Sequence, residues 1–251
     1  MNAPCGLTRT KCTSVQSDFL APRKAGLSHQ EFRDYVTRVH APLVKSVPEV
    51  AGAIHHYHYN FPLAGRTDEA FGHPIAAHLD VVTEAWFDSR AAQIANMSGA
   101  RYLAEVRPDE GRFADEGRAV MHYTHEIEIT PGASTGGKLF YFRRRCAGLG
   151  REEFQSKWRH GFTEIVGDSP IWRSVVSRYV QNHVFPEADH PSGDDPRFFD
   201  VIDELFLAEA GAEAALRRDQ RMVSRIAALE HQLLDKARTC AIVTETVRNI
   251  E

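Results

Sequence analysis

The chain has 251 residues, of which 43% are hydrophobic and 25% are charged, a balance typical of an ordinary globular protein. Its net charge is −4 and it has no stripe of lysine and arginine, which argues against a nucleic acid or an anionic membrane as partner. No stretch approaches the roughly 20 apolar residues of a membrane span. The four cysteines form no CxxC pair, so we expect a cytoplasmic protein without a disulfide framework.

The first half of the chain predicts the order strand, helix, strand, strand, helix, strand. Ser28 and Glu31 form an S-x-x-E capping box, and Phe32 and Tyr35 continue at helical spacing, so a helix begins at this point. Strands are expected at 53–60, 78–87 and 119–129, where β-branched and aromatic residues gather, and an alanine-rich second helix at 89–106. The second half predicts the same order, with a strand at 138–145, a long helix within 207–235 and a last strand at 239–250.

The two halves also repeat each other in sequence. "RKAGLSHQEF" begins at Arg23 and "RCAGLGREEF" begins at Arg145, 122 positions later, and the same offset carries Tyr57 onto Tyr179. "DVVTEAWF" from Asp80 matches "DVIDELFL" from Asp200 at an offset of 120. Several short matches in one order indicate a duplicated unit. We therefore predict one half at residues 9–130, a linker at 131–137 and a second, diverged half at 138–251.

The order βαββαβ is the ferredoxin-like arrangement, an antiparallel sheet with both helices on one face. Two such sheets can cover each other's open faces. The predicted fold class is α+β: tandem ferredoxin-like repeats that close an α+β barrel within one chain, with apolar sheet faces turned inward. Two independent domains, each binding something on its open face, are the alternative.

The segment "RKAGLSHQEFRDYVTRVHAPLV" resembles the opening of the EthD family within the dimeric α+β-barrel superfamily. "LDVVTEAWFDS" and "RPDEGRFAD" resemble later segments of that family. The resemblance covers most of 23–129 and, more weakly, 145–250. It implies a cavity, small aromatic or polyketide-like substrates and chemistry without a bound cofactor. It fixes no reaction, because the superfamily includes enzymes of several classes. The second half departs from the pattern, because Phe162 falls on the His40 position and His160 lies two residues earlier.

The stretch "AIHHYHYN" at 53–60 is the densest group of candidate functional residues. Side chains alternate along a strand, so His56, His58 and Asn60 share one face and Tyr57 lies on the other. Neither face is cleanly apolar, and the sequence leaves open which one lines the cavity. His78 or His122 could complete a metal site with His56 and His58. A catalytic zinc needs about three protein ligands and no H-E-x-x-H motif occurs, so we expect no metal.

General acid–base catalysis is the favoured hypothesis, because histidine titrates near neutral pH. His40 at the end of the first helix is the leading candidate, although a histidine at that place could instead cap the helix. The expected catalytic residues are His40, His56, His58 and Tyr57. The expected substrate-binding residues are Asn60, Trp86, Arg143, Trp158, Arg178 and Tyr179.

Together these features predict a cofactor-independent lyase, a decarboxylase or dehydratase, that acts on a small aromatic or hydrophobic acid. A cofactor-free oxygenase, or a cyclase or isomerase of an aromatic or polyketide-like compound, is one alternative. A barrel that binds a small ligand without turnover is another. Association of two barrels into a homodimer stays open.

Overall fold

The computed structural model describes residues 15–63, 72–134, 136–185, 195, 197–209 and 212–250. The elements of the first half are, in chain order, β1 (Val15–Ala21), α1 (His29–Tyr35), the π-helical turn η1 (Val36–His40), α2 (Ala41–Ser46), α3 (Pro48–Ala51), β2 (His56–Pro62), β3 (Val81–Phe87), α4 (Arg90–Met97), the π-helical turn η2 (Tyr102–Val106), α5 (Arg107–Phe113) and β4 (Val120–Thr130). Those of the second half are β5 (Lys138–Arg143), α6 (Arg151–Gly167), α7 (Pro170–Val175), β6 (Val176–Val184), β7 (Val201–Leu207), α8 (Glu213–Leu216), α9 (Gln220–Leu233), the 3₁₀ turn η3 (Lys236–Arg238) and β8 (Cys240–Ile250).

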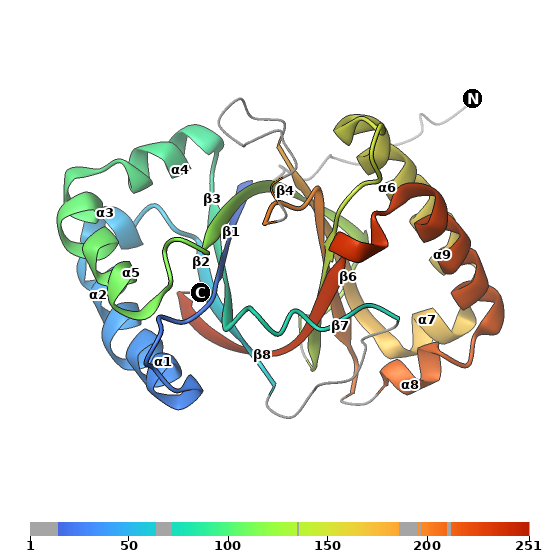
Figure 1. The fold of residues 1–251 in the computed structure, drawn as a ribbon, viewed down its shortest axis with the longest axis horizontal. Helices are drawn as coiled ribbons and strands as arrows, with labels where there is room; N and C mark the ends of the chain where they lie inside the picture. Colours follow the sequence, from blue (N-terminus) through green and yellow to red (C-terminus); the bar gives the residue numbers. More distant parts are fainter. Residues whose placement is uncertain are drawn as a thin grey trace, which may run out of the picture.

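The eight strands close an antiparallel barrel in the order β1-β3-β2-β8-β5-β7-β6-β4. The two halves meet where β2 pairs with β8 and where β4 pairs with β6. Figure 1 shows the barrel end-on, with the helices of the first half on one side and those of the second half on the opposite side. This architecture confirms the predicted fold class. None of the described helices combines the length and apolar character that crossing a membrane requires.

The repeated Arg-x-Ala-Gly-Leu motif forms the same turn at the entrance to each helical layer. Arg23 Nε donates to the carbonyl of Leu27 over 2.8 Å, and Asp80 Oδ2 accepts the backbone N–H of Arg23 at 2.8 Å. Gly26 has a φ of +94°, in the left-handed region that glycine adopts without steric cost. The equivalent bonds and a positive φ recur in the second half, at Arg145, Leu149, Asp200 and Gly148. The sequence repeat is therefore also a repeat of local structure.

The predicted helix start is confirmed, and the predicted second helices are interrupted. Ser28 accepts the N–H of Glu31 while the Glu31 carboxylate accepts the N–H of Ser28, a complete capping box. The helix expected over 89–106 was wrong as one element: α4 ends with Ser98 as its C-cap, and η2 and α5 follow. The helix expected within 207–235 divides in the same way, because Asp219 caps a new helix by accepting the N–H of Met222.

The interior of the barrel is polar at its centre, which corrects the expectation of two apolar sheet faces. Lys138 Nζ lies 2.6 Å from Glu84 Oε2 and 2.9 Å from Glu204 Oε2, and all three side chains are buried. Gln16 Nε2 donates to Glu84 and to Glu204, each over 3.2 Å. An apolar cluster also lies within the barrel and contains, among others, Leu20, Val82, Phe140, Phe142, Ile202 and Ile242. Most of these polar groups bond to one another, although Gln16 Oε1 and Asn182 Oδ1 have no hydrogen-bond partner among the described residues.

The buried charges divide unequally among the carboxyl groups. The Lys138 ammonium and hydrogen bonds hold the pKa of Glu204 at about 2 against the effect of burial, so Glu204 is ionised. Burial and the neighbouring Glu204 raise the pKa of Glu84 well above its usual range, which favours its protonated form. Burial, followed by Glu204, raises the pKa of Asp18 to about 7. One lysine is thus balanced mainly by one carboxylate.

Candidate functional site

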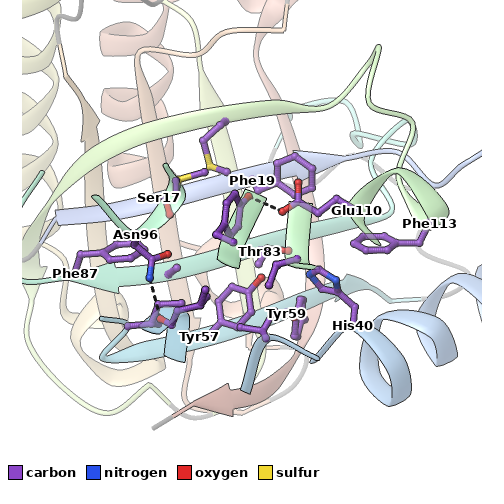
Figure 2. Close-up of a pocket in the computed structure, with 18 residues that line it drawn as sticks. Ser17, Phe19, His40, Tyr57, Tyr59, Thr83, Phe87, Asn96, Glu110 and Phe113 are labelled. Atoms are coloured by element: carbon purple, nitrogen blue, oxygen red, sulfur yellow. Dashed lines mark hydrogen bonds between the residues drawn. The ribbon is translucent and has the colours of Figure 1, made fainter. Parts of the chain in front are cut away.

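A small pocket, the half-one cavity, lies between the barrel wall and the helices of the first half. Its open volume is about 60 Å³, and its polar lining includes His40, Tyr57, Tyr59, Tyr102 and Glu110. Figure 2 shows His40, Tyr57, Tyr59 and Glu110 gathered around this pocket from the strand β2 and from the helical layer. The other lining side chains are mostly apolar and include Met97 and Met121. A few polar groups that converge in an apolar pocket are typical of a binding or catalytic site.

His40 is positioned as a proton acceptor. It is the last residue of the π-helical turn η1, is 2% exposed, and its Nδ1 lies 2.9 Å from Asp109 Oδ2 on α5. Asp109 also accepts a hydrogen bond from Tyr35 Oη at 2.6 Å, which fixes the carboxylate. Burial lowers the pKa of His40, and Asp109 opposes this shift less strongly. A neutral imidazole that donates from Nδ1 to a carboxylate carries its lone pair on Nε2. In the described part of the chain, Nε2 has no hydrogen-bond partner.

Three tyrosines supply hydroxyl groups to the same cavity. The rings of Tyr57 and Tyr59 lie 4.9 Å apart in an edge-to-face arrangement on β2. Tyr102 Oη donates to Glu110 Oε1 over 2.7 Å. Burial is the main cause that raises the pKa of each of these tyrosines, so all three stay protonated and can donate hydrogen bonds. Burial also raises the pKa of Glu110.

The strand β2 separates the predicted catalytic residues into two groups. Tyr57 faces the helices and the half-one cavity, whereas His56 and His58 line a cavity of about 400 Å³ inside the barrel. The residues that line this lumen cavity include Trp86 and Arg178. The prediction of one site built from His40, Tyr57, His56 and His58 therefore does not fit the geometry, because side chains at alternate positions leave the sheet on opposite faces.

The lumen residues are mostly occupied by one another. Asn60 Nδ2 donates to Glu84 Oε2 over 2.6 Å, and Arg178 forms ion pairs with Glu126 and Glu128 at 2.5 and 2.9 Å. Burial, with Lys138 and Arg248 nearby, lowers the pKa of His58 to about 4, so this imidazole is neutral. Asn60 and Arg178, both predicted to bind substrate, thus form internal hydrogen bonds and ion pairs.

The histidines do not assemble into a three-ligand metal site in the part of the chain that the structure describes. His122 accepts the backbone N–H of Phe199 at 3.0 Å, and His78 lies outside the strands and is exposed. One group of three candidate ligands is found among the described residues, Asp18, Glu84 and Glu204. The Lys138 ammonium already provides a cation beside two of these carboxyl groups.

The remaining predicted substrate-binding residues lie in the second half. Arg143 points between sheet and helices, as expected of an inward arginine, but its guanidinium pairs with Asp203 at 2.8 Å and with Glu230 at 2.9 Å. Both sides of this predicted substrate-binding side chain are thus paired with carboxylates of the protein. Trp158 is fully buried beneath it, and Tyr179 lines a second cavity. His160 is exposed on α6 and bonds to the carbonyl of Ser156, so Phe162 is the counterpart of His40.

Sequence reasoning missed four members of the half-one cavity or its support: Asp109, Tyr59, Tyr102 and Glu110. Asp109 and Glu110 lie within the segment "RPDEGRFAD", whose only signal in the sequence is its resemblance to a later segment of the EthD family. They lie about 70 positions from His40 in the chain, and no spacing rule connects a helix-borne acid to a histidine on another helix.

Comparison with known proteins places the first half within one family. A model of the EthD domain matches residues 24–117. A curated protein of Metarhizium robertsii (strain ARSEF 23 / ATCC MYA-3075), named conidial pigment biosynthesis dehydratase EthD, is 30% identical over 105 residues. The aligned region covers 39% of this chain and 72% of that protein. His40, Asp109, Tyr57 and Tyr59 all lie within the residues that the domain model matches.

Solved structures share the fold at low identity. The crystal structure of an anthrone oxidase-like protein has a TM-score of 0.60 and 9% identity, and the match covers 96% of this chain and 95% of that one. A candidate monooxygenase from Lactobacillus acidophilus NCFM has a TM-score of 0.51 and 10% identity, with 94% of each chain covered. At such identities the likeness shows the barrel architecture and nothing about the reaction.

Proposed function

Because the chain belongs to the EthD family, we propose that it is a cofactor-independent lyase of the dehydratase type whose catalytic site is the half-one cavity. The observation that carries this proposal is the pairing of His40 with Asp109 in a tyrosine-lined pocket, with Nε2 of His40 left without a partner among the described residues. The family relative named as a dehydratase supports the reaction class. The substrate class is a small hydroxylated aromatic or polyketide-like compound.

His40 acts as the general base in this proposal. Nε2 takes a proton from a carbon next to a carbonyl group, and the electron pair of that C–H bond forms the new double bond. Asp109 holds the reactive tautomer and stabilises the imidazolium that forms. The lowered pKa of His40 keeps the base unprotonated at neutral pH.

A tyrosine completes the elimination. Tyr57 Oη gives a proton to the departing hydroxyl group, the C–O bond breaks, and one water leaves. The His40 imidazolium then returns its proton to the Tyr57 phenolate, so both side chains are neutral again at the end of the reaction. The buried hydroxyls of Tyr57 and Tyr59 have pKa values above their usual range and remain donors throughout this sequence.

The open space of about 60 Å³ equals the volume that roughly two water molecules occupy in liquid water. An aromatic ring can therefore enter only if lining side chains move. Met97 and Met121 line the cavity, and methionine is unbranched and adapts its shape readily. We propose that these two side chains move when substrate binds. Small aromatic rings fit this limit better than long or branched acids.

The test uses the full chain, under nitrogen and in D₂O, with a panel of β-hydroxy ketones fused to an aromatic ring. A product that has lost one water and has taken up no deuterium at the carbon next to the carbonyl supports the proposal, because that carbon loses one hydrogen and gains none. Tyr57→Phe should lower kcat by about 10²-fold, whereas Tyr123→Phe, outside the cavity on β4, should leave it unchanged. Loss of carbon dioxide from carboxylated analogues, or oxygen consumption in air with no dehydration, would contradict it.

A further inference from the structure

The second half contains a cavity of its own, the half-two cavity, in the position equivalent to the half-one cavity. Its volume is about 490 Å³, within the range of small-molecule sites, against about 60 Å³ in the first half. Four aromatic side chains line it: Tyr141, Phe162, Trp172 and Tyr179. Phe162 stacks on Tyr179 with ring centroids 4.8 Å apart, and Trp172 meets Tyr179 edge-to-face at 5.4 Å.

Three acid–base groups of the first half have no counterpart of the same chemistry in this cavity, whereas Tyr57 and Glu110 correspond to Tyr179 and Glu230. At offsets of 122 and 120 positions, His40 is replaced by Phe162, Asp109 by Leu229 and Tyr102 by Met222. The base, its orienting carboxylate and one hydroxyl donor are all gone. The half-two cavity therefore lacks the His40–Asp109 pair on which the proposed dehydration depends.

The half-two cavity also carries positive charge that the first half lacks. Arg143, Arg217 and Lys236 line it together with a single lining acid, Glu230. Arg143 pairs with Asp203 and Glu230, and Lys236 Nζ lies 3.8 Å from Glu230 Oε2, so the three cations of the lining outnumber these two acids. Arg217 and Lys236 are exposed side chains at the opening, and their counterparts in the first half are Met97 and Glu116. An opening with two cations favours a ligand that carries an anionic group.

A segment from the first half helps to close this cavity. His73 is buried, its Nε2 lies 2.8 Å from Glu230 Oε1, and its ring meets Tyr141 edge-to-face at 5.8 Å. Arg143 Nη1 lies 3.0 Å from the same His73 nitrogen. His73 and Arg143 are buried, whereas Arg217 and Lys236 are exposed, so the ligand's anionic group is expected beside Arg217 and Lys236.

We propose that the half-two cavity is a binding site for a flat aromatic carboxylic acid of one or two rings. The rings lie among Tyr141, Phe162, Trp172 and Tyr179, and the carboxylate meets Arg217 and Lys236 at the opening. This site is separate from the proposed catalytic site, and binding here does not depend on the dehydratase assignment.

The test is a calorimetric titration of the full chain with 1-naphthoate, which requires no turnover. Ala227 lines the opening and is exposed, so Ala227→Trp should block the cavity without disturbing the core and weaken binding at least about tenfold. Ala228→Trp is the matched control, because Ala228 is exposed on the same helix but does not line the cavity. It should bind as the unaltered protein does.

The contribution of positive charge at the opening is tested at Arg217, with its neighbour Arg218 as the control. Arg217→Glu should weaken 1-naphthoate binding about fivefold, whereas Arg218→Glu, exposed and outside the cavity, should change it less than about twofold. The uncharged 1-naphthalenemethanol should bind more weakly than 1-naphthoate. Absence of 1-naphthoate binding, equal binding in Ala227→Trp, or equal binding of the alcohol would each overturn the proposal.

Discussion

The two halves of this protein have the same fold and carry different cavities in equivalent places. In the first half, the π-helical turns η1 and η2 interrupt the helical layer, and each carries a cavity residue, His40 and Tyr102. In the second half, the equivalent of the first helix is α6, a continuous α-helix of 17 residues. π-Helical turns are frequent at functional sites because they turn side chains away from their regular helical direction.

The two halves share one scaffold and differ at the positions that line their cavities. The barrel walls and the entrance turns are retained in both halves, since closure of the sheet depends on them. The cavity residues differ in chemistry, with His40 replaced by Phe162 in a much larger space. Architecture and function are therefore set by separate groups of residues.

The largest effect is expected when His40 is replaced by phenylalanine, the residue type at the equivalent position of the second half. His40→Phe removes the base but keeps an aromatic ring, and turnover in the dehydration assay should fall by about 10² to 10⁴-fold. Near-ultraviolet circular dichroism would verify that the fold is intact. The reciprocal change, Phe162→His, should leave dehydration unaltered. Full turnover by His40→Phe would remove His40 from the mechanism.

The next largest effect is expected on stability. Gln16 and Lys138 occupy equivalent positions, so Lys138→Gln makes the two halves alike while it removes the one ammonium beside Glu84 and Glu204. Loss of one partner of a buried ion pair should lower the free energy of unfolding by about 3–5 kcal/mol. Urea denaturation measures this change. Lys157→Gln, which breaks an exposed pair with Glu153, should cost under about 0.5 kcal/mol.

The role of Asp109 can be tested with a substitution that keeps the size and shape of the side chain. Asp109→Asn offers an amide that can donate to Nδ1, which favours the tautomer with its proton on Nε2 and disables the base. We expect kcat to fall by about 10²-fold. Steady-state kinetics would measure it, with Asp115→Asn as a partly exposed control. A decrease no larger than that of the control would show that Asp109 does not orient His40.

The smallest expected effect concerns the pH dependence of stability. Asp18 lies where the second half has Phe140, and its folded-state pKa of about 7 is above the ordinary value of 3.8. Its contribution to stability is therefore complete below pH 3.8 and is lost as the pH rises through about 7. Asp18→Asn removes this loss and should be more stable than the unaltered protein by about 1–3 kcal/mol above pH 7. Denaturation at several pH values measures it; equal curves at high pH would contradict the assignment.

Several features of the fold could be predicted from the sequence because their causes are local. The capping box at Ser28, the glycine turns and the strand composition each act within a few residues. The same local signals recur in the second half. Two sheets that each have one uncovered face can bury both faces by packing them against each other. Boundaries of the second helices were predicted less well, because Asp219 can cap a helix within a segment that looks continuous.

The face of β2 could not be predicted, since the usual criterion of an apolar inner face fails in this barrel. His56, His58 and Asn60 point into a lumen whose polar groups bond to one another, so an inward face resembles an outward one in the sequence.

From the sequence we could predict the order of elements, the barrel and His40 as the leading candidate, and we could find the internal repeat. Only the tertiary structure decided which side chains meet: Asp109 with His40, Glu230 with Arg143, and Lys138 with two carboxyl groups. The physical reason is that secondary structure depends on neighbours in the chain, whereas pKa values and hydrogen bonds depend on groups brought together by packing. The separation of one catalytic candidate and one binding candidate into two cavities follows from that packing alone.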